Sequence, residues 1–277
     1  MKYMAQLILG SVGKPDLASS GPFFAWLHPA ASTIKPTSPV SPSLPGEKIA
    51  RSRADDGLFR QSLVIAAALC ISGCAAQRDH RPGSVTIGEN LEGWACYLAD
   101  PDVQVQDVWR VEDGVIVCSG KPLGYLYTKK DFLDFVLKLQ WRWPGAAEQG
   151  KGGVLIRMTG EHKVWPRSLE AQINAGGAGD FWGLAGYELS GSAERMRSLD
   201  HAEFGKLTNV KKTKALEKPP GQWNTYEIIA QGDTVTLIIN GEQVNKATGC
   251  ALDSGKICLT SEGSEIHFQN VVVTAIP

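Results

Sequence analysis

The alternation of side chains along residues 132–143 constrains the fold more than any other feature of this sequence. Apolar side chains occupy every second position, and polar or smaller ones stand between them, with Phe135, Leu137, Leu139, Trp141 and Trp143 opposed to Val136, Lys138, Gln140 and Arg142. Successive side chains of a β-strand point to opposite faces of its sheet. This period of two therefore indicates a long strand with one buried face.

Two later segments repeat the alternation. Residues 153–159 set Val154, Ile156 and Met158 against Leu155 and Arg157, and residues 168–174 set Leu169, Ala171 and Ile173 against Glu170, Gln172 and Asn174. Elsewhere, turn signals separate short apolar runs. Glu112-Asp113-Gly114 divides residues 103–111 from residues 115–119, and Asn240-Gly241 is the strongest short hairpin signal in the chain.

The remaining segments also indicate strands, over residues 124–128, 223–231, 234–239, 243–248, 256–261 and 265–275. The one helix that the sequence suggests is short and covers residues 193–203. Many short strands with almost no helix predict an all-β fold. We expect a two-sheet antiparallel β-sandwich of the jelly-roll type, with one face of each sheet packed inward.

The first 57 residues differ from the rest of the chain. They contain LHPAASTIKPTSPVSPSLPGEK, which is rich in Pro and Ser and has neither strand nor helix periodicity. Such a segment cannot bury enough apolar surface to offset the entropy of ordering it. We predict that residues 1–57 are a disordered extension or are never translated.

Residues 58–73 have the layout of a secretory signal. Arg60 supplies the positive charge, an apolar core follows, and Ile71-Ser72-Gly73 places small residues before Cys74. The segment resembles a bacterial lipoprotein signal, in which Cys74 would be lipidated and become the mature N-terminus. The alternative is a buried core helix.

This interpretation has consequences for the start of the chain and its location. Translation would begin at Leu58 from an alternative start codon, and residues 74–87 would link the lipid anchor to a domain over residues 88–277. We expect an exported protein, a periplasmic or outer-membrane lipoprotein of a bacterium that Cys74 anchors to the membrane.

Composition limits the partners and the redox chemistry. The chain has 277 residues with a formal net charge of −1, whereas proteins that bind nucleic acid usually carry a basic excess, so no nucleic acid is expected as a partner. An oxidising compartment would allow one or two disulfides, in any of three pairings, among Cys96, Cys118, Cys250 and Cys258. No Cys or His spacing suggests a zinc site.

Long polar side chains of both signs occupy the outward positions of the three alternating segments. If these segments are neighbours, one face carries Lys138, Gln140, Arg142, Arg157, Glu170, Gln172 and Asn174. Such groups hydrogen-bond sugar hydroxyls, and Trp165 and Trp182 in nearby loops could stack on a sugar ring. Ala171 and residues 176–179, with their glycines, would let a ligand approach closely. The alternative is a plainly solvated sheet face, which antiparallel sheets commonly have.

Five segments of the chain occur in a characteristic order, namely DFLDFVLKLQWRW, GGVLIRM, VWPRSLEAQI, PPGQWNTYEIIAQGDTVTLIINGEQV and SGKICLTSEGSEIHFQNVVV. Together they resemble the bacterial 3-keto-disaccharide hydrolase family over about residues 88–277. The resemblance implies a β-sandwich of the concanavalin-A-like lectin and glucanase type. Two positions depart from the family pattern: Gly152-Gly153 stands where Asn-Ser-Gly is expected, and Ala171 where a larger residue is common.

The resemblance implies a glycosidase-type hydrolase whose substrate is a 3-keto-disaccharide or another small keto-glycoside. A ketone at C3 acidifies the hydrogen at C2, so a base can remove it, the enolate expels the C1 leaving group, and water adds back. Glu170 is expected to be the general base. Arg157 and Arg142 are expected to stabilise the enolate oxygen.

The other candidate residues would bind the sugar or assist the chemistry. The expected sugar contacts are Gln172, Asn174, Trp165, Trp182, Gln140, Lys138 and Asp180, and the second-line acids or bases are His162, His201 and Glu188. The sequence establishes no cofactor with certainty. A divalent metal ion could replace the arginines, with oxygen ligands from Asp180 and Glu188, although nothing in their spacing requires one.

Three alternatives stay open. An ordinary glycosidase would need a second carboxylate about 5 Å from Glu170 for retention, or about 6.5–9.5 Å for inversion; Asp180, Glu188 or Asp200 could fold back to supply it. A noncatalytic carbohydrate-binding module could use the same face, because sandwiches host lectins and enzymes alike. A structural envelope lipoprotein would bind no sugar.

Overall fold

The computed structural model describes residues 84–86, 91–145 and 150–276. The predicted N-terminal extension, the signal segment and the lipidation site at Cys74 lie outside the described residues. Within the described ranges, no helix is long and apolar enough to cross a membrane.

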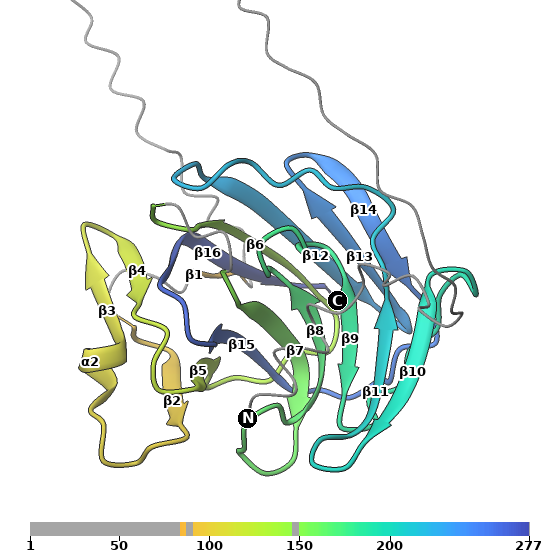
Figure 1. Cartoon of the computed structure of the whole chain (residues 1–277), viewed down its shortest axis with the longest axis horizontal. Coiled ribbons are helices and arrows are strands. Elements are labelled where there is room, and N and C mark those ends of the chain that lie inside the picture. Colours follow the sequence, from red (N-terminus) through yellow and green to blue (C-terminus); the bar gives the residue numbers. More distant parts are fainter. Residues whose placement is uncertain (1–83, 87–90, 146–149, 277) are drawn as a thin grey trace, which may run out of the picture. The chain divides into compact units, whose positions relative to one another are not determined.

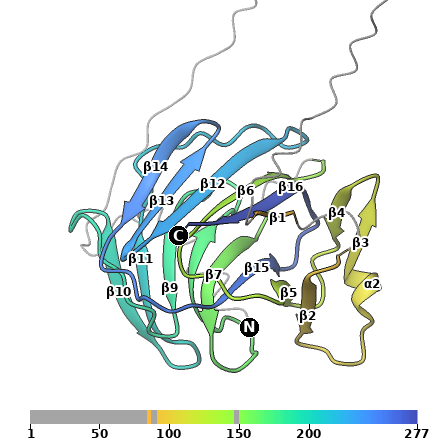
Figure 2. The same ribbon diagram turned by 180° about the vertical axis from the view of Figure 1, so that it is seen from behind.

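Two antiparallel sheets of eight strands each form the structure (Figures 1 and 2). The first sheet contains β1 (Ser84–Thr86), β3 (Trp109–Glu112), β4 (Val115–Cys118), β6 (Phe135–Arg142), β12 (Asn224–Gln231), β13 (Thr234–Ile239), β14 (Glu242–Ala247) and β16 (Ile266–Ala275). Its strands follow the order β14-β13-β12-β6-β16-β4-β3, and β1 pairs with β16.

The second sheet carries the strands that matter for the site. It contains β2 (Trp94–Leu98), β5 (Gly124–Thr128), β7 (Gly153–Thr159), β8 (Arg167–Gln172), β9 (Phe181–Leu184), β10 (Met196–His201), β11 (Gly205–Val210) and β15 (Lys256–Ser261). Their order is β10-β11-β9-β8-β7-β15-β5-β2. The prediction of an all-β, two-sheet antiparallel sandwich is confirmed.

Alternation along each strand builds the core between the sheets. In β6, Phe135, Leu137 and Trp141 are 0% exposed, and each such buried side chain contributes about 1.5–3 kcal/mol to folding. In β8, Leu169 and Ala171 join the same core cluster. The side chains between them, including that of Glu170, therefore point to the opposite side, which we call the outer face of the second sheet.

The prediction that the three alternating segments are neighbouring strands was wrong for the first of them. β7 pairs with β8, but β6 pairs with β12 and β16 in the first sheet. Lys138, Gln140 and Arg142 therefore lie on the outer face of the first sheet, and the core separates them from Glu170. Alternation determines which side chains are buried, but it carries no information about which strand is the partner.

The predicted helix over residues 193–203 was also wrong. Residues 196–201 form β10, which pairs with β11 in an edge hairpin. The described structure instead has a one-turn helix, α2 (Val105–Val108), inside the segment predicted as a strand over residues 103–111. In both places, pairing with a neighbouring strand or packing on the core outweighs a weak local preference.

The four cysteines beyond the signal segment are free thiols, so the disulfides that the sequence allowed are not formed. Cys118, Cys250 and Cys258 are buried, and Cys96 is half-buried. Burial raises the pKa of Cys96 to about 11 and that of Cys118 to about 12. Thiols with such pKa values stay protonated and unreactive at neutral pH.

Arg157 is a structural residue that joins three parts of the fold. It lies at a β-bulge in β7 with φ 50°, which turns its side chain out of the strand's alternation. The guanidinium is 0% exposed and donates to the carbonyl oxygens of Leu133, Ala251 and Gly232 and to the carboxylate of Asp134. With its Nε, Nη1 and Nη2 all engaged, it is not available at the outer face where it was predicted to act.

We expect Arg157→Met to lower the free energy of unfolding by about 3–5 kcal/mol, because it leaves a partner charge and three carbonyl groups without their donor. Urea unfolding measures the loss. Arg110→Met is the matched control: its side chain is 43% exposed, and its loss should change stability by no more than about 0.5 kcal/mol. Equal effects of the two substitutions would contradict the structural role.

Candidate functional site

Glu170 occupies the middle of the outer face of the second sheet. Leu155 on β7 and Trp182 on β9 stand beside it across the sheet. Its side chain nevertheless lies away from solvent, at 2% exposure. Gly153 makes this burial feasible, since a Cβ at that position would lie 2.6 Å from Oε1 of Glu170. The carboxyl thus fills the space that any other residue at position 153 would occupy.

Glu262 supplies a second carboxyl, which the sequence analysis missed. It comes directly after β15, two residues beyond Thr260. The hydroxyl of Thr260 accepts a hydrogen bond from the Gly153 N–H (2.7 Å) and lies 3.1 Å from the Gly153 carbonyl oxygen. β15 therefore brings Glu262 up to the same glycine over which Glu170 lies. The negative charge of Glu262 acts directly on Glu170, whose pKa it raises.

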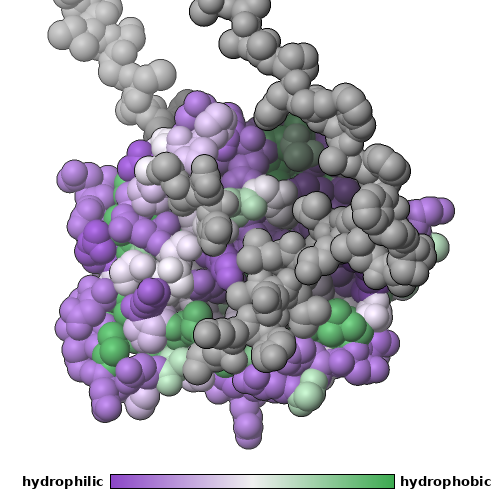
Figure 3. Space-filling view, in the orientation of Figure 1, coloured by the Kyte–Doolittle hydropathy of each residue, from purple (hydrophilic) through white to green (hydrophobic). Residues whose placement is uncertain are grey.

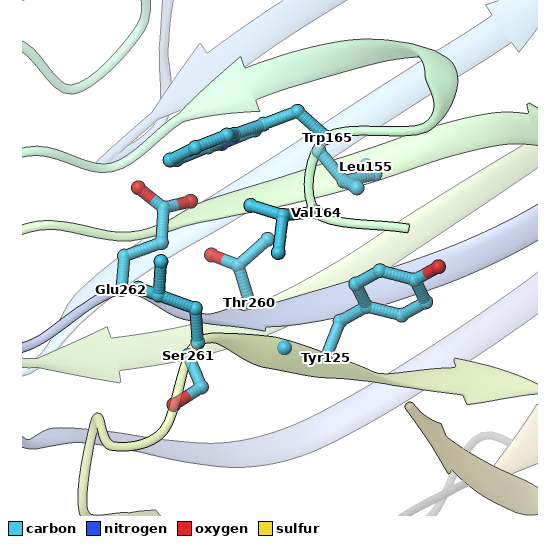
Figure 4. Close-up of a pocket in the computed structure, with 9 residues that line it drawn as sticks. Tyr125, Leu155, Val164, Trp165, Thr260, Ser261 and Glu262 are labelled. Atoms are coloured by element: carbon cyan, nitrogen blue, oxygen red, sulfur yellow. The ribbon is translucent and has the colours of Figure 1, made fainter. Parts of the chain in front are cut away.

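A small recess of about 10 Å³, enough for about one water molecule, lies beside Glu262 (Figure 4). Figure 4 shows the carboxyl of Glu262 pointing toward the indole of Trp165, with Thr260 on the floor and Tyr125 at the far side, whereas Ser261 points away. Leu155 and Val164 complete an apolar wall. The recess is far smaller than the ~300–1,000 Å³ of typical ligand pockets. A ligand larger than water would therefore lie over it and not inside it.

Burial raises the pKa of both carboxyls. For Glu170, burial is the largest cause, and the charges of Glu262 and Asp180 raise the pKa further, so that it lies well above the ordinary value. For Glu262, burial again raises the pKa, but a hydrogen bond with Thr260 and the positive charge of Lys151 oppose it. Glu170 therefore keeps its proton to a higher pH than Glu262. A pair of neighbouring carboxyls in such surroundings suits proton transfer.

Two buried hydrogen-bond donors near Glu170 have no partner among the described residues. They are Nε2 of Gln172, the next outward residue on β8, and Nε1 of Trp182, opposite Glu170 on β9. A buried donor without an acceptor costs about 1–3 kcal/mol. An oxygen-rich ligand would satisfy both groups. Asn174, also predicted to contact the sugar, already accepts a hydrogen bond from the Gly152 N–H (2.8 Å) through its side-chain oxygen.

The loop between β7 and β8 brings Trp165 to the recess and places His162 against Tyr125, which lines it. Nδ1 of His162 lies 3.0 Å from the hydroxyl of Tyr125. Trp165 packs edge-to-face on Phe204, which stacks on His201. Trp165 has φ 53°, in the left-handed region that side-chain-bearing residues rarely adopt. Residues held in this way cluster at binding and catalytic sites, because the surrounding structure must offset the strain.

The remaining predicted residues have other contacts. The side chain of Asp180 accepts a hydrogen bond from the Lys212 N–H (2.9 Å), and Glu188 is exposed. Arg142 donates to Nδ1 of His267 (3.2 Å) on the first sheet. Within the described ranges, no three His, Cys, Asp or Glu side chains are grouped as a metal site. Asp180 and Glu188 thus have no third ligand there.

Glu262 could have been found by extending the alternation of β15 beyond its end. Cys258 and Thr260 occupy outward positions, and Glu262 is the next position in the same series. The sequence Glu262-Gly263-Ser264 also has the composition of a turn, and this signal hid the residue's place in the sheet.

The comparisons with known proteins agree with this architecture. A family model described as the 3-keto-alpha-glucoside-1,2-lyase-like domain matches residues 84–274. The chain belongs to this family. The resemblance seen in the sequence is thereby confirmed, and the match begins at β1. A search of curated proteins found no relative.

Several solved structures are similar to the chain at low sequence identity. A putative glycosyl hydrolase from Parabacteroides distasonis has a TM-score of 0.50 at 19% identity, covering 70% of this chain and 95% of that chain. The carbohydrate-binding module CBM66 from Bacillus subtilis has 0.47 at 13% identity (66% and 96% covered). The Bacillus licheniformis β-glucanase also has 0.47, at 10% identity (71% and 99% covered). The first likeness supports the fold alone.

We expect the protein to lose stability as the pH rises above the unfolded-state pKa of Glu170. The folded pKa is raised above the ordinary value of 4.5. Between these two values the folded protein binds more protons than the unfolded chain, so the free energy of unfolding falls with rising pH. Urea unfolding over a pH series should show this fall in the wild type and a smaller one in Glu170→Gln. The exposed Glu112→Gln should behave as the wild type, and a wild-type slope in Glu170→Gln would contradict the raised pKa.

We expect Gly153→Ala to displace the carboxyl of Glu170 and to cost about 1–3 kcal/mol of unfolding free energy. Gly152→Ala is the matched control, because its methyl group would meet Ile266 and Trp143 at 3.4 Å, which is ordinary van der Waals contact. Urea unfolding of both variants measures the difference. Equal costs would mean that Gly153 is not what makes room for the carboxyl.

Proposed function

We propose that this protein cleaves 3-keto-glycosides by base-assisted elimination followed by addition of water. The observation that carries the proposal is the pair of neighbouring carboxyls, buried Glu170 and half-buried Glu262, beside a small recess with an indole wall. The family to which the chain belongs supports the same chemistry, since its description names a 3-keto-α-glucoside and a 1,2-lyase.

The reaction needs a proton acceptor and a proton donor at adjacent carbons. A carboxylate of the pair takes the proton from C2, and the electron pair of that C–H bond moves into an enolate with the C3 ketone. The enolate re-forms the ketone as the C1–O bond breaks, which leaves a C1=C2 double bond, and the departing oxygen takes a proton. Water then adds its oxygen to C1 and a proton to C2. A positioned carboxyl typically contributes about 10²–10⁴-fold to each such proton transfer.

The enolate oxygen needs hydrogen-bond donors, and the arginines predicted for this role lie elsewhere. Nε2 of Gln172 and Nε1 of Trp182 are the buried donors without acceptors at this face. Neither lines the recess beside Glu262, so we assign them to substrate oxygen atoms that lie outside it, where donors held in place by the protein stabilise charge better than water does. Lys151, whose charge acts on Glu262, adds a cation at the same site.

An ordinary glycosidase would also use two carboxyls, and a carbohydrate-binding module could use the same recess without chemistry. A single experiment in D₂O separates the three. Elimination breaks the C2–H bond, so the 3-keto-glucose released from a 3-keto-disaccharide should carry deuterium at C2. Ordinary hydrolysis would leave hydrogen there, and a binding module would release no product. Mass spectrometry and proton NMR of the product measure the outcome.

Two controls make the deuterium result specific. Authentic 3-keto-glucose incubated without protein gives the rate of spontaneous exchange at C2, which must be slower than enzymatic release. The double variant Glu170→Gln/Glu262→Gln should release no product. Glu227→Gln should behave as the wild type, because Glu227 pairs with Lys138 on the first sheet, across the core from the recess. Product without deuterium would overturn the proposed mechanism.

A further inference from the structure

The two carboxyls of the pair are not equally close to the recess. Glu262 lines it, and in Figure 4 its carboxyl points toward the indole of Trp165. Glu170 is 2% exposed and is not among the lining residues. Its carboxyl lies over Gly153. A general base must come within about 2.6–3.2 Å of the proton that it removes. Glu262, which lines the recess, is the carboxyl of the pair that a sugar ring lying over the recess would meet.

We infer that Glu262 is the catalytic residue that takes the C2 proton, and that Glu170 is a neutral positioning residue behind it. The inference rests on the proposed function and reverses the role that the sequence suggested for Glu170. The proton of C2 would move to Glu262 and then to the oxygen that leaves C1. Glu262 is thereby a carboxylate again at the end of the elimination, and no further acid is needed.

The contacts of Glu262 support its role as an acceptor. Its Oε1 is buried and has no hydrogen-bond partner among the described residues. This oxygen is an acceptor without a donor, in a wall that also contains the indole of Trp165. Burial raises the pKa of this carboxyl, and the hydrogen bond with Thr260 and the positive charge of Lys151 oppose that rise and favour the ionised form. A base must be in that form before the substrate arrives.

The surroundings of Glu170 instead favour the protonated, neutral form of its carboxyl. The described structure gives it no ion-pair partner, and the charges that act on it are those of Glu262 and Asp180, both negative. Two neighbouring carboxyls that are shielded from water cannot both ionise at low cost, so the more deeply buried one keeps the proton. A neutral Glu170 can fill the space over Gly153 and hold the adjacent carboxylate in position without repelling it.

Trp165 completes the arrangement. Its left-handed backbone conformation and its contact with Phe204 aim the indole across the recess toward the carboxyl of Glu262. An indole over a carboxylate excludes water on that side, which makes the carboxylate a stronger base than it would be in solution.

Substitution by glutamine separates the two roles, because glutamine resembles a protonated glutamate in shape and charge. We expect Glu262→Gln to lower kcat at least about 10³-fold with little change in KM. Glu170→Gln should keep kcat within about 10-fold of the wild type, since the substitution preserves the neutral state. Steady-state kinetics with a 3-keto-disaccharide measures both, after urea unfolding has shown that each variant is folded.

Alanine variants give a second readout that a purely structural role would not produce. Glu262→Ala leaves a space open to the recess, so added formate should restore part of the turnover in a concentration-dependent way. Glu170→Ala should lose activity, and formate should not restore it, because that space lies behind Glu262. This pair of variants keeps the test decisive if Glu262→Gln does not fold.

Comparable loss in Glu170→Gln and Glu262→Gln would overturn the inference, as would full activity in both. Formate rescue of Glu170→Ala in place of Glu262→Ala would overturn it as well. None of these results bears on the proposed function, because that proposal is tested by the deuterium content of the wild-type product. If the wild-type protein releases no product, the proposed function itself is wrong.

Discussion

A carboxyl buried on the outer face of a sheet is the constraint on which the rest of this site depends. Taking a carboxyl out of water costs several kcal/mol unless it is neutral or paired with a cation. Glu170 has no cation beside it among the described residues, and a second carboxyl, Glu262, lies close enough to raise its pKa. The protein can keep the pair only by sharing protons between its members. Proton sharing of this kind is the property that acid–base chemistry uses.

The sandwich holds this unfavourable pair in place with ordinary structural interactions. Large side chains on alternating positions of both sheets form one continuous core. Arg157 adds a buried network that connects the β7 bulge to segments around Asp134, Gly232 and Ala251. The carboxyls themselves stand on β8 and just beyond the end of β15, and sites supported by strands are held more precisely than sites on loops.

The surface agrees with a small polar ligand better than with a protein partner. Figure 3 shows that hydrophilic side chains dominate the visible face where described residues are seen. The exposed large apolar side chains in the described ranges are Val105, Leu133, Met196 and Leu252, and none of them lines the recess. Two of the buried donors without a partner, those of Gln172 and Trp182, lie near Glu170, and an aromatic side chain faces Glu262. The same fold serves lectins and hydrolases, so these residues, and not the sandwich, carry the functional argument.

The sequence by itself determined which side of each strand is buried. The alternation along residues 132–143 and 168–174 predicted the core positions of β6 and β8 and the outward direction of Glu170. The Asn240-Gly241 signal predicted the β13–β14 hairpin, where the two residues have φ 51° and 86°. These features are local, because side-chain direction and turn conformation depend on residues within a few positions of one another.

Only the tertiary structure decided which of those faces meet. Strand pairing placed Lys138, Gln140 and Arg142 on the other sheet, and a β-bulge turned Arg157 inward. Residues 196–201 paired as a strand. Glu262 lies next to Glu170, although the two residues are 92 positions apart along the chain. Backbone hydrogen bonds between strands are nearly the same for any sequence, so a strand's own residues do not determine which strand it pairs with. The pairing follows from how all the apolar faces can be buried together, which is a property of the whole domain.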